Sequence, residues 1–345
     1  MKLRALDNPP SPYETTHVEW LEPPPVARLE IFTDDSQSIL SKNDSPDLPF
    51  TWSVNPYRGC QHACAYCYAR RTHEYLGLGA GTDFETKIVV KPEAAKLLRR
   101  SFESRKWKGE SVNFSGVTDC YQPLEAAYGI TRECLKVCLE FRNPASVVTK
   151  GCLVARDADL LAKLNEVARA RVWISIPFAD AEACALIEPQ APHPLRRIET
   201  IRRLTQAGVP TGVMVAPIIP GLNDRDIPWV LEHAAAAGAT SACFTALRLP
   251  GNVREVFVKR IAEVMPLRAK KILNRQRDTH GGELNRSAFG ERMRGDGPYW
   301  EAIKSLFEVS RLRYGLAGHR EATAMEGETG KLTKPTDPQL LLGFE

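Results

Sequence analysis

The chain has 345 residues, with 46 Lys and Arg against 42 Asp and Glu, so its formal net charge is only +4. A composition of 43% hydrophobic and 26% charged residues is that of an ordinary globular protein and excludes a disordered or fibrous chain. No apolar stretch approaches the roughly 18–20 residues that span a bilayer, and the first residues contain no apolar signal region. We therefore expect a soluble, cytoplasmic protein that does not associate with membranes.

The first 50 residues contain 8 of the 25 prolines and are polar between them. This composition predicts an N-terminal arm over 1–50, extended and with at most a short strand near 27–32. The last 25 residues are poor in apolar side chains until Leu340, which is typical of a tail.

Between residues 51 and 250, short apolar or β-branched runs alternate with helix-like stretches. We expect strands at 51–54, 112–117, 146–149, 172–176, 212–217 and 242–246, and helices at 92–104, 131–141, 157–170, 196–207 and 227–237. This alternation is typical of βα units that form a parallel sheet. Six units are fewer than the eight of a closed barrel. The prediction is therefore an α/β fold, a partial (β/α)6 TIM-type barrel over 51–250.

A C-terminal extension over 251–345 follows, in which a helix is expected near 254–264. Between Arg268 and Arg320 the chain has 12 basic and 6 acidic residues, a local charge of 12 − 6 = +6. Two interpretations stay open for this region. Its basic side chains and interleaved aromatic rings could bind a nucleic-acid backbone and stack on bases, the rings being Phe289, Tyr299, Trp300 and Tyr314. Alternatively, it forms solvated amphipathic helices that close the open barrel.

The nine cysteines argue for reduced thiols, because an odd number without a signal peptide does not form a disulfide framework. Cys60, Cys64 and Cys67 lie within eight residues, directly after the first expected strand. One loop can therefore hold three thiolates around a metal centre. A structural zinc ion would need a fourth ligand, for which His62 or His73 is available. A [4Fe–4S] cluster would instead leave one of its four irons open.

The segment Cys60-x3-Cys64-x-Tyr66-Cys67 resembles the cysteine motif of the radical S-adenosylmethionine (SAM) superfamily. The resemblance implies that the three cysteines ligate a [4Fe–4S] cluster and that SAM binds the fourth iron. It further implies that reduction cleaves SAM to methionine and a 5′-deoxyadenosyl radical, which abstracts a hydrogen atom from the substrate. A flavodoxin- or ferredoxin-type protein would then supply the electron.

Residues 55 to 223 are similar to one branch of this superfamily, the proteins related to spore photoproduct lyase, which includes uncharacterised bacterial "DNA repair photolyase"-like proteins. The resemblance implies five SAM-contacting residues: Tyr66 and Ala216 at the adenine, Lys150 at the carboxylate or ribose, and Thr118 and Ser175 as further contacts.

One position departs from this branch. In spore photoproduct lyase, a cysteine two residues before the SAM contact at Thr118 returns a hydrogen atom to the product radical, and this chain has Gly116 there. The nearest thiol is that of Cys120, which is a weak candidate for the hydrogen donor. The lyase reaction itself is therefore not implied.

These observations predict a radical SAM enzyme with a lyase-like or transferase-like reaction and a nucleic-acid substrate. Modification of a peptide or of a small metabolite is the alternative within the same chemistry. The alternative from another class is a non-catalytic, zinc-stabilised nucleic-acid-binding protein that uses the same cysteines.

Overall fold

The computed structural model describes residues 4–17, 22 and 24–318, and its main feature is an eight-stranded sheet. Six of its strands run parallel in chain order and occupy the six expected positions: β3 (Trp52–Val54), β6 (Val112–Phe114), β7 (Ala145–Thr149), β8 (Ala170–Ser175), β9 (Thr211–Ile218) and β10 (Ser241–Ala246). Their carboxyl ends therefore lie at one edge, which we call the mouth of the barrel.

Two further strands flank these six. β2 (Leu40–Lys42) pairs antiparallel with β3, and β11 (Ala317–Gly318) pairs parallel with β10. The two flanking strands do not pair with each other, so the sheet stays open. This confirms the predicted partial barrel.

The five expected helices are present and connect successive strands: α3 (Ala94–Glu103), α5 (Ile130–Glu140), α6 (Ala158–Val167), α8 (Pro194–Gln206) and α9 (Ile227–Ala236). Shorter helices precede them: α4 (Glu125–Tyr128), η2 (Cys152–Asp157), α7 (Ala181–Ile187) and η3 (Asp224–Asp226). The helix α8 begins with a proline and is followed by Gly208 at a φ of +83°, which agrees with the conformations these residues favour.

A second, three-stranded sheet was not predicted. In it β5 (Lys87–Val90) pairs parallel with β1 (Glu30–Thr33) and antiparallel with β4 (Tyr57–Arg58). The N-terminal segment therefore contributes a strand to each sheet, β1 near the expected 27–32 and β2 where none was expected. The connection from β4 to β5 contains η1 (Tyr68–Arg70), α1 (Arg71–Glu74) and α2 (Thr82–Thr86).

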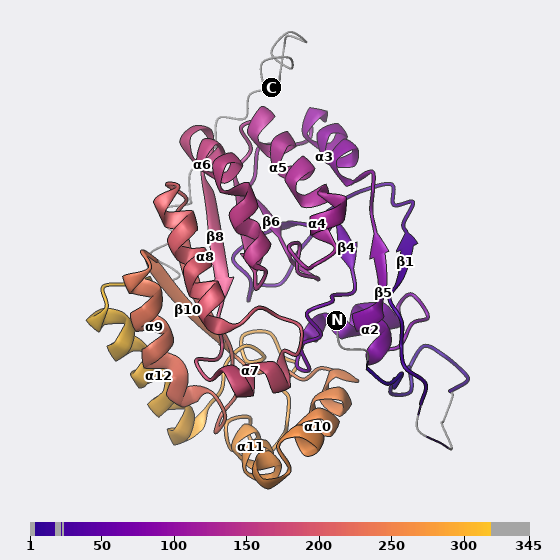
Figure 1. Ribbon diagram of the computed structural model, residues 1–345, viewed down its shortest axis with the longest axis vertical. Helices are drawn as coiled ribbons and strands as arrows, with labels where there is room; N and C mark the ends of the chain where they lie inside the picture. Colours follow the sequence, from indigo (N-terminus) through magenta and orange to yellow (C-terminus); the bar gives the residue numbers. More distant parts are fainter. Residues whose placement is uncertain (1–3, 18–21, 23, 319–345) are drawn as a thin grey trace.

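Three helices form the C-terminal part: α10 (Val253–Val264), α11 (Pro266–Asp278) and α12 (Gly297–Arg313). Figure 1 shows α10 and α11 beside α7, beyond the carboxyl end of β8 and far from α3, α5 and α6. Helix α12 packs against α9 and buries Trp300, Ile303 and Phe307 in the main core. The expected tail over the last 25 residues lies outside the described residues.

The hydrophobic core has two large parts. The main part lies between the sheet and its covering helices. The second part joins Cys64 and Tyr66 of the cysteine loop to Ile187 of α7, Phe257 of α10 and Ile272 of α11. The C-terminal helices therefore support the cysteine loop directly. In the described part of the chain, no helix combines the length and the apolar character needed to span a bilayer.

Candidate active site

The three clustered cysteines lie on the loop between β4 and η1. Cys60 and Cys64 are buried and Cys67 is half-buried. The fully buried guanidinium group of Arg70 holds this loop in place. Its Nε and Nη2 donate to the carbonyl of Cys64 at 3.0 and 2.9 Å, its Nη1 donates to the carbonyls of Ala80 and Gly81, and its Nη2 also donates to Glu85.

A second connection ties the loop to the segment after β6. The Gln61 backbone N–H donates to the side chain of Gln122 at 3.0 Å, and the Gln122 amide donates back to the Gly59 carbonyl at 3.1 Å. The Gln61 side chain in turn accepts from the Leu124 backbone at 2.9 Å. These buried hydrogen bonds fix the loop above the first strands without using any thiol, so all three thiols stay available to a ligand.

The thiols lie in a buried environment that contains both a carboxylate and cationic side chains. Burial raises the pKa of Cys64, and it raises the pKa of Cys67 to about 11. The Glu188 carboxylate raises the pKa of Cys64 further, whereas the ammonium group of Lys150 opposes both shifts and Arg70 opposes the shift at Cys67. Thiols bound to a metal are deprotonated, so these neighbouring cations favour the ligated form. The residues present therefore fit a cluster at this loop.

His62 lies beside the cysteines but pairs with Asp119. Burial would lower the pKa of His62, yet the Asp119 carboxylate, 3.3 Å from Nδ1, and the neighbouring Cys60 sulfur together raise it to about 10. Asp119 also accepts from the Thr149 hydroxyl at 2.5 Å and from the Lys150 backbone at 2.7 Å. His73 donates from Nε2 to the Lys87 carbonyl at 2.8 Å. Among the described residues, no three His, Cys, Asp or Glu side chains are grouped around a single ion position.

Tyr66 and Lys150 lie together at the mouth. The Lys150 Nζ is 5.6 Å from the centre of the Tyr66 ring and 3.8 Å from Oε1 of Glu188. The Tyr66 hydroxyl donates to the same carboxylate. Glu188 is fully buried and pairs with Arg197 at 2.5 Å. Burial raises the pKa of Glu188, and the Arg197 charge opposes that shift.

Ser175 and Ala216 form a second group on neighbouring strands. The Ser175 hydroxyl donates to the Ala216 carbonyl at 3.0 Å, and the Arg197 guanidinium donates to the Ser175 carbonyl at 3.0 Å. Arg197 therefore connects this group to Glu188 and hence to Lys150. Thr118 is buried and donates to the Tyr57 carbonyl at 2.9 Å, so its hydroxyl proton is already used.

The position where the resemblance implies a hydrogen-donating thiol is tightly packed. A Cβ on Gly116 would lie 3.0 Å from both Cβ and Oγ of Ser53 on β3. Cys120, the weak candidate, has 0% exposure and belongs to the main hydrophobic core. Its burial suits a packing residue, and its role as hydrogen donor stays a prediction.

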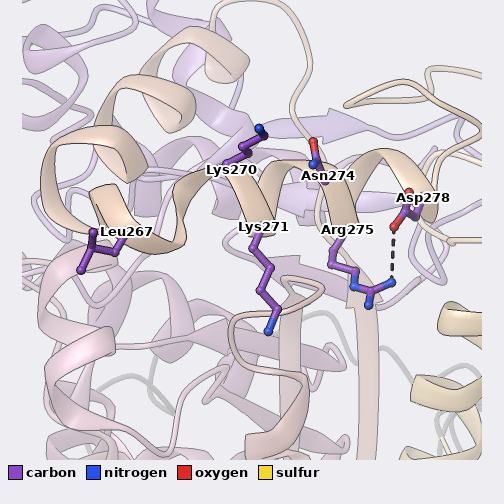
Figure 2. A pocket seen from close by; sticks show the side chains of 6 residues that line it. All are labelled: Leu267, Lys270, Lys271, Asn274, Arg275 and Asp278. Carbon is purple, nitrogen blue, oxygen red and sulfur yellow. Dashed lines mark hydrogen bonds and ion pairs between the residues drawn. The ribbon is translucent and has the colours of Figure 1, made fainter.

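In the basic C-terminal region, not all of the aromatic rings are placed where they could stack on bases. Trp300 is 1% exposed and packs in the core, so its expected role as a base-stacking ring is wrong. Phe289 is 61% exposed, and Tyr299 lies under Arg275 at 4.5 Å. A shallow groove of about 430 Å³ follows α11. The groove is lined by Leu267, Lys270, Lys271, Asn274, Arg275 and Asp278. Figure 2 shows Lys271 and Arg275 extending from the same side of the helix.

Four residues that organise this site had no role in the sequence-based prediction: Arg70, Gln122, Glu188 and Arg197. Arg70 is only three residues beyond Cys67, and this proximity was the one signal available. Glu188 and Arg197 lie within the segment that resembles the spore photoproduct lyase branch, but the resemblance implied no role for them, and the packing of α7 and α8 brings them to the mouth.

Comparisons with known proteins agree with this geometry. The model of the radical SAM superfamily matches residues 54–234. An uncharacterized protein of Mycobacterium tuberculosis is 37% identical over 233 residues, which cover 67% of this chain and 68% of that protein. A radical SAM Nalpha-GlyT isomerase of Pseudomonas phage M6 is 26% identical over 188 residues, which cover 54% of this chain and 37% of that protein.

Among solved structures, spore photoproduct lyase complexed with dinucleoside spore photoproduct has a similar fold, with a TM-score of 0.62 and 15% sequence identity over 84% of this chain and 81% of that chain. The superfamily is one of enzymes that use a [4Fe–4S] cluster and SAM, so its match decides against the non-catalytic zinc-binding alternative. Because the superfamily match spans more than half of the residues, this chain belongs to the radical SAM superfamily and is a radical SAM enzyme.

Proposed function

We propose that this radical SAM enzyme holds its [4Fe–4S] cluster on Cys60, Cys64 and Cys67 and acts on a nucleic acid. The observation that carries the cluster assignment is the rigid buried loop whose three thiols take no part in fastening it. The cations near these thiols support the same assignment, since they stabilise thiolate ligands.

SAM would lie at the mouth, between the pair Tyr66 and Lys150 on one side and the pair Ser175 and Ala216 on the other. Lys150 would bind its carboxylate or ribose, Tyr66 and Ala216 would contact its adenine, and Ser175 and Thr118 would complete the pocket. A reduced cluster supplies the electron that cleaves SAM, and a flavodoxin- or ferredoxin-type protein is the proposed donor of that electron. Glu188 orients Tyr66 and Lys150, because it contacts both and is itself fixed by Arg197.

Charge supports the choice of a nucleic acid as substrate. Helix α11 lies at the mouth, and Lys270, Lys271 and Arg275 line a shallow groove along it. Lys271 and Arg275 extend from one side of the helix and Lys270 from the other, and Arg275 pairs with Asp278 at 3.4 Å (Figure 2). Basic side chains that line a groove neutralise phosphates. The similar spore photoproduct lyase was solved with a dinucleoside ligand, which supports the same class of substrate.

The chemistry is tested anaerobically. The protein is reconstituted with iron and sulfide and reduced, and 5′-deoxyadenosine is measured after SAM is added. We expect slow formation by the native chain and none by Cys64→Ala. A native protein that assembles no cluster would contradict the assignment of the three cysteines.

The substrate is tested on the same preparations with single-stranded oligonucleotides and with a peptide mixture. We expect oligonucleotides to accelerate 5′-deoxyadenosine formation and to bind less tightly to a Lys270→Gln/Lys271→Gln double variant. Lys96→Gln is the matched control, because Lys96 is an exposed lysine on α3. Acceleration by the peptides alone would favour the alternative substrate class and contradict the proposal.

A further inference from the structure

Arg248 lies at the mouth, two residues beyond the end of β10. The backbone on both sides of it is fixed, because the Leu247 N–H donates to the Ile218 carbonyl at 3.0 Å and the Leu249 N–H donates to Asn285 at 2.9 Å. The side chain therefore starts from a rigid position at the carboxyl end of the parallel strands, where substrates of such sheets bind.

This half-buried guanidinium group has no anionic partner within the described residues. Its Nε is buried without a hydrogen-bond partner, and Arg248 forms no ion pair there. An arginine side chain stays protonated in a protein, so its charge is retained. A desolvated charge without a counter-ion is unfavourable, which makes this side chain a ready ligand for an anion from outside.

The carboxylate whose charge acts on Arg248, that of Asp47, already has other hydrogen-bond and ion-pair partners. Asp47 pairs with Arg292 at 2.5 Å and accepts from the Gly290 N–H at 2.7 Å. Burial lowers the pKa of Arg248, and the charges of Arg292 and Arg71 lower it further, against the opposing effects of Tyr68 and Asp47. Positive charges near Arg248 therefore outweigh negative ones, which favours the binding of an anion.

The surroundings of Arg71 add to this excess. Its side chain lies against the loop that carries Arg248, with Nε 3.2 Å from the place that a Cβ on Gly251 would take. Glu74, the acidic residue near Arg71, accepts a hydrogen bond from Asn252 at 2.6 Å. Arg248 and Arg71 thus both lie at this side of the mouth, whereas the charge of the third guanidinium group, that of Arg292, is paired with Asp47.

The distance to the cysteine loop is short. The Arg248 Cζ is 5.9 Å from the centre of the Tyr68 ring, and Tyr68 directly follows Cys67 in the chain. Tyr68 is 48% exposed and its hydroxyl donates to the Gly116 carbonyl at 2.8 Å. An anion bound to Arg248 would therefore be separated from the proposed cluster only by the side chain of Tyr68.

We propose that Arg248 binds a phosphodiester group of the nucleic-acid substrate at the entrance to the cluster, an inference that rests on the proposed substrate class. The planar guanidinium group presents paired N–H donors that match two phosphate oxygens. Arg71 adds positive charge beside it, and the basic helix α11 packs against the same segment, since the Gln276 side chain donates to the Leu247 carbonyl at 3.2 Å. The contact fixes the position of the nucleotide relative to the cluster rather than its base identity.

The test uses the reconstituted, full-length protein under anaerobic conditions and a fluorescent single-stranded oligodeoxynucleotide of mixed sequence. We expect Arg248→Gln to weaken binding about tenfold or more, the effect of losing one charged hydrogen-bonding pair. The slope of log affinity against log salt should fall by about 0.7, the value for one single-strand phosphate. Arg203→Gln on α8 is the matched control, because Arg203 is exposed and carries an ordinary surface ion pair.

A second probe replaces the phosphodiesters by uncharged methylphosphonates. The native chain and Arg248→Gln should bind this probe equally, and Arg248→Lys should bind the charged probe with intermediate affinity. Thermal unfolding of Arg248→Gln should occur no earlier than in the native chain, because the substitution removes an unpaired charge.

Three results would overturn the inference in different ways. If the native chain binds the oligonucleotide but Arg248→Gln binds it equally well, the phosphate contact is wrong and the proposed substrate class stands. If the native chain binds no oligonucleotide, the substrate class itself fails. If Arg248→Gln loses affinity for SAM instead, the anion is the SAM carboxylate.

Discussion

At the scale of single residues, the pair of Glu188 and Arg197 has a large predicted effect on stability. Both side chains have 0% exposure and are 2.5 Å apart. Glu188→Gln leaves the Arg197 charge buried without a counter-ion, so we expect a loss of about 3–5 kcal/mol in the free energy of unfolding. Urea unfolding checks this against Glu199→Gln, which breaks an exposed pair with Arg202 and should change stability by less than about 1 kcal/mol. Equal effects of the two variants would contradict the prediction.

His73 predicts a pH dependence of stability. Burial lowers its pKa from 6.5 to about 4, so the unfolded chain takes up a proton first as the pH falls. Its contribution to stability is therefore complete above about pH 6.5 and is lost between pH 6.5 and 4, by about 3 kcal/mol in all. His73→Gln removes this titration and should flatten the curve of unfolding free energy against pH in that interval. An unchanged slope in the variant would show that other groups cause the acid sensitivity.

The residues of the site were only partly predictable from the sequence. The three cysteines and Tyr66 form a local motif, and Lys150 and Ser175 follow predictable strands, so their positions were expected. Glu188 and Arg70 have polar side chains that are fully or nearly fully buried. The residues next to them in the sequence do not indicate that these charged side chains are buried. Their burial is what makes their hydrogen bonds and ion pairs important for the shape of the site.

At the scale of elements, the loop from β4 to η1 depends on Arg70. Arg70→Met removes the donors to the carbonyls of Cys64, Ala80 and Gly81, and each buried acceptor without a donor costs about 1–3 kcal/mol. We expect a looser loop and less iron and sulfide bound per chain after reconstitution. Arg100→Met on the exposed side of α3 is the control and should retain full iron binding. Full iron binding by both variants would refute the role of Arg70 in shaping the loop.

The elements of the barrel were predictable because each carries its own signals. Apolar runs mark the buried parallel strands, and Pro and Gly mark the helix ends, as at α8. The second sheet had no comparable signal, because β4 has two residues and all four residues of β1 are exposed. Such short or exposed strands form only when β5 is placed beside them.

At the scale of the whole molecule, α12 packs beside α9 and covers β10. Phe307 is 1% exposed and packs in the main core, 4.5 Å from the Phe244 ring of β10. Phe307→Ala should lower the free energy of unfolding by about 3–5 kcal/mol, since it creates a cavity in the core. Leu312→Ala on the same helix is the control, because Leu312 is 68% exposed. Equal stability of the two variants would mean that α12 does not belong to the core.

The sequence by itself determined the fold class, the order of the βα units and the loop that carries the three cysteines, because hydrophobic periodicity and motif spacing act over short stretches of chain. Only the tertiary structure decided which polar side chains meet at the mouth. Arg197 joins Glu188 to Ser175, and Arg248 comes within 5.9 Å of the Tyr68 ring. The physical reason is that buried charges depend on partners from distant segments, and no local pattern records which segments packing will bring together.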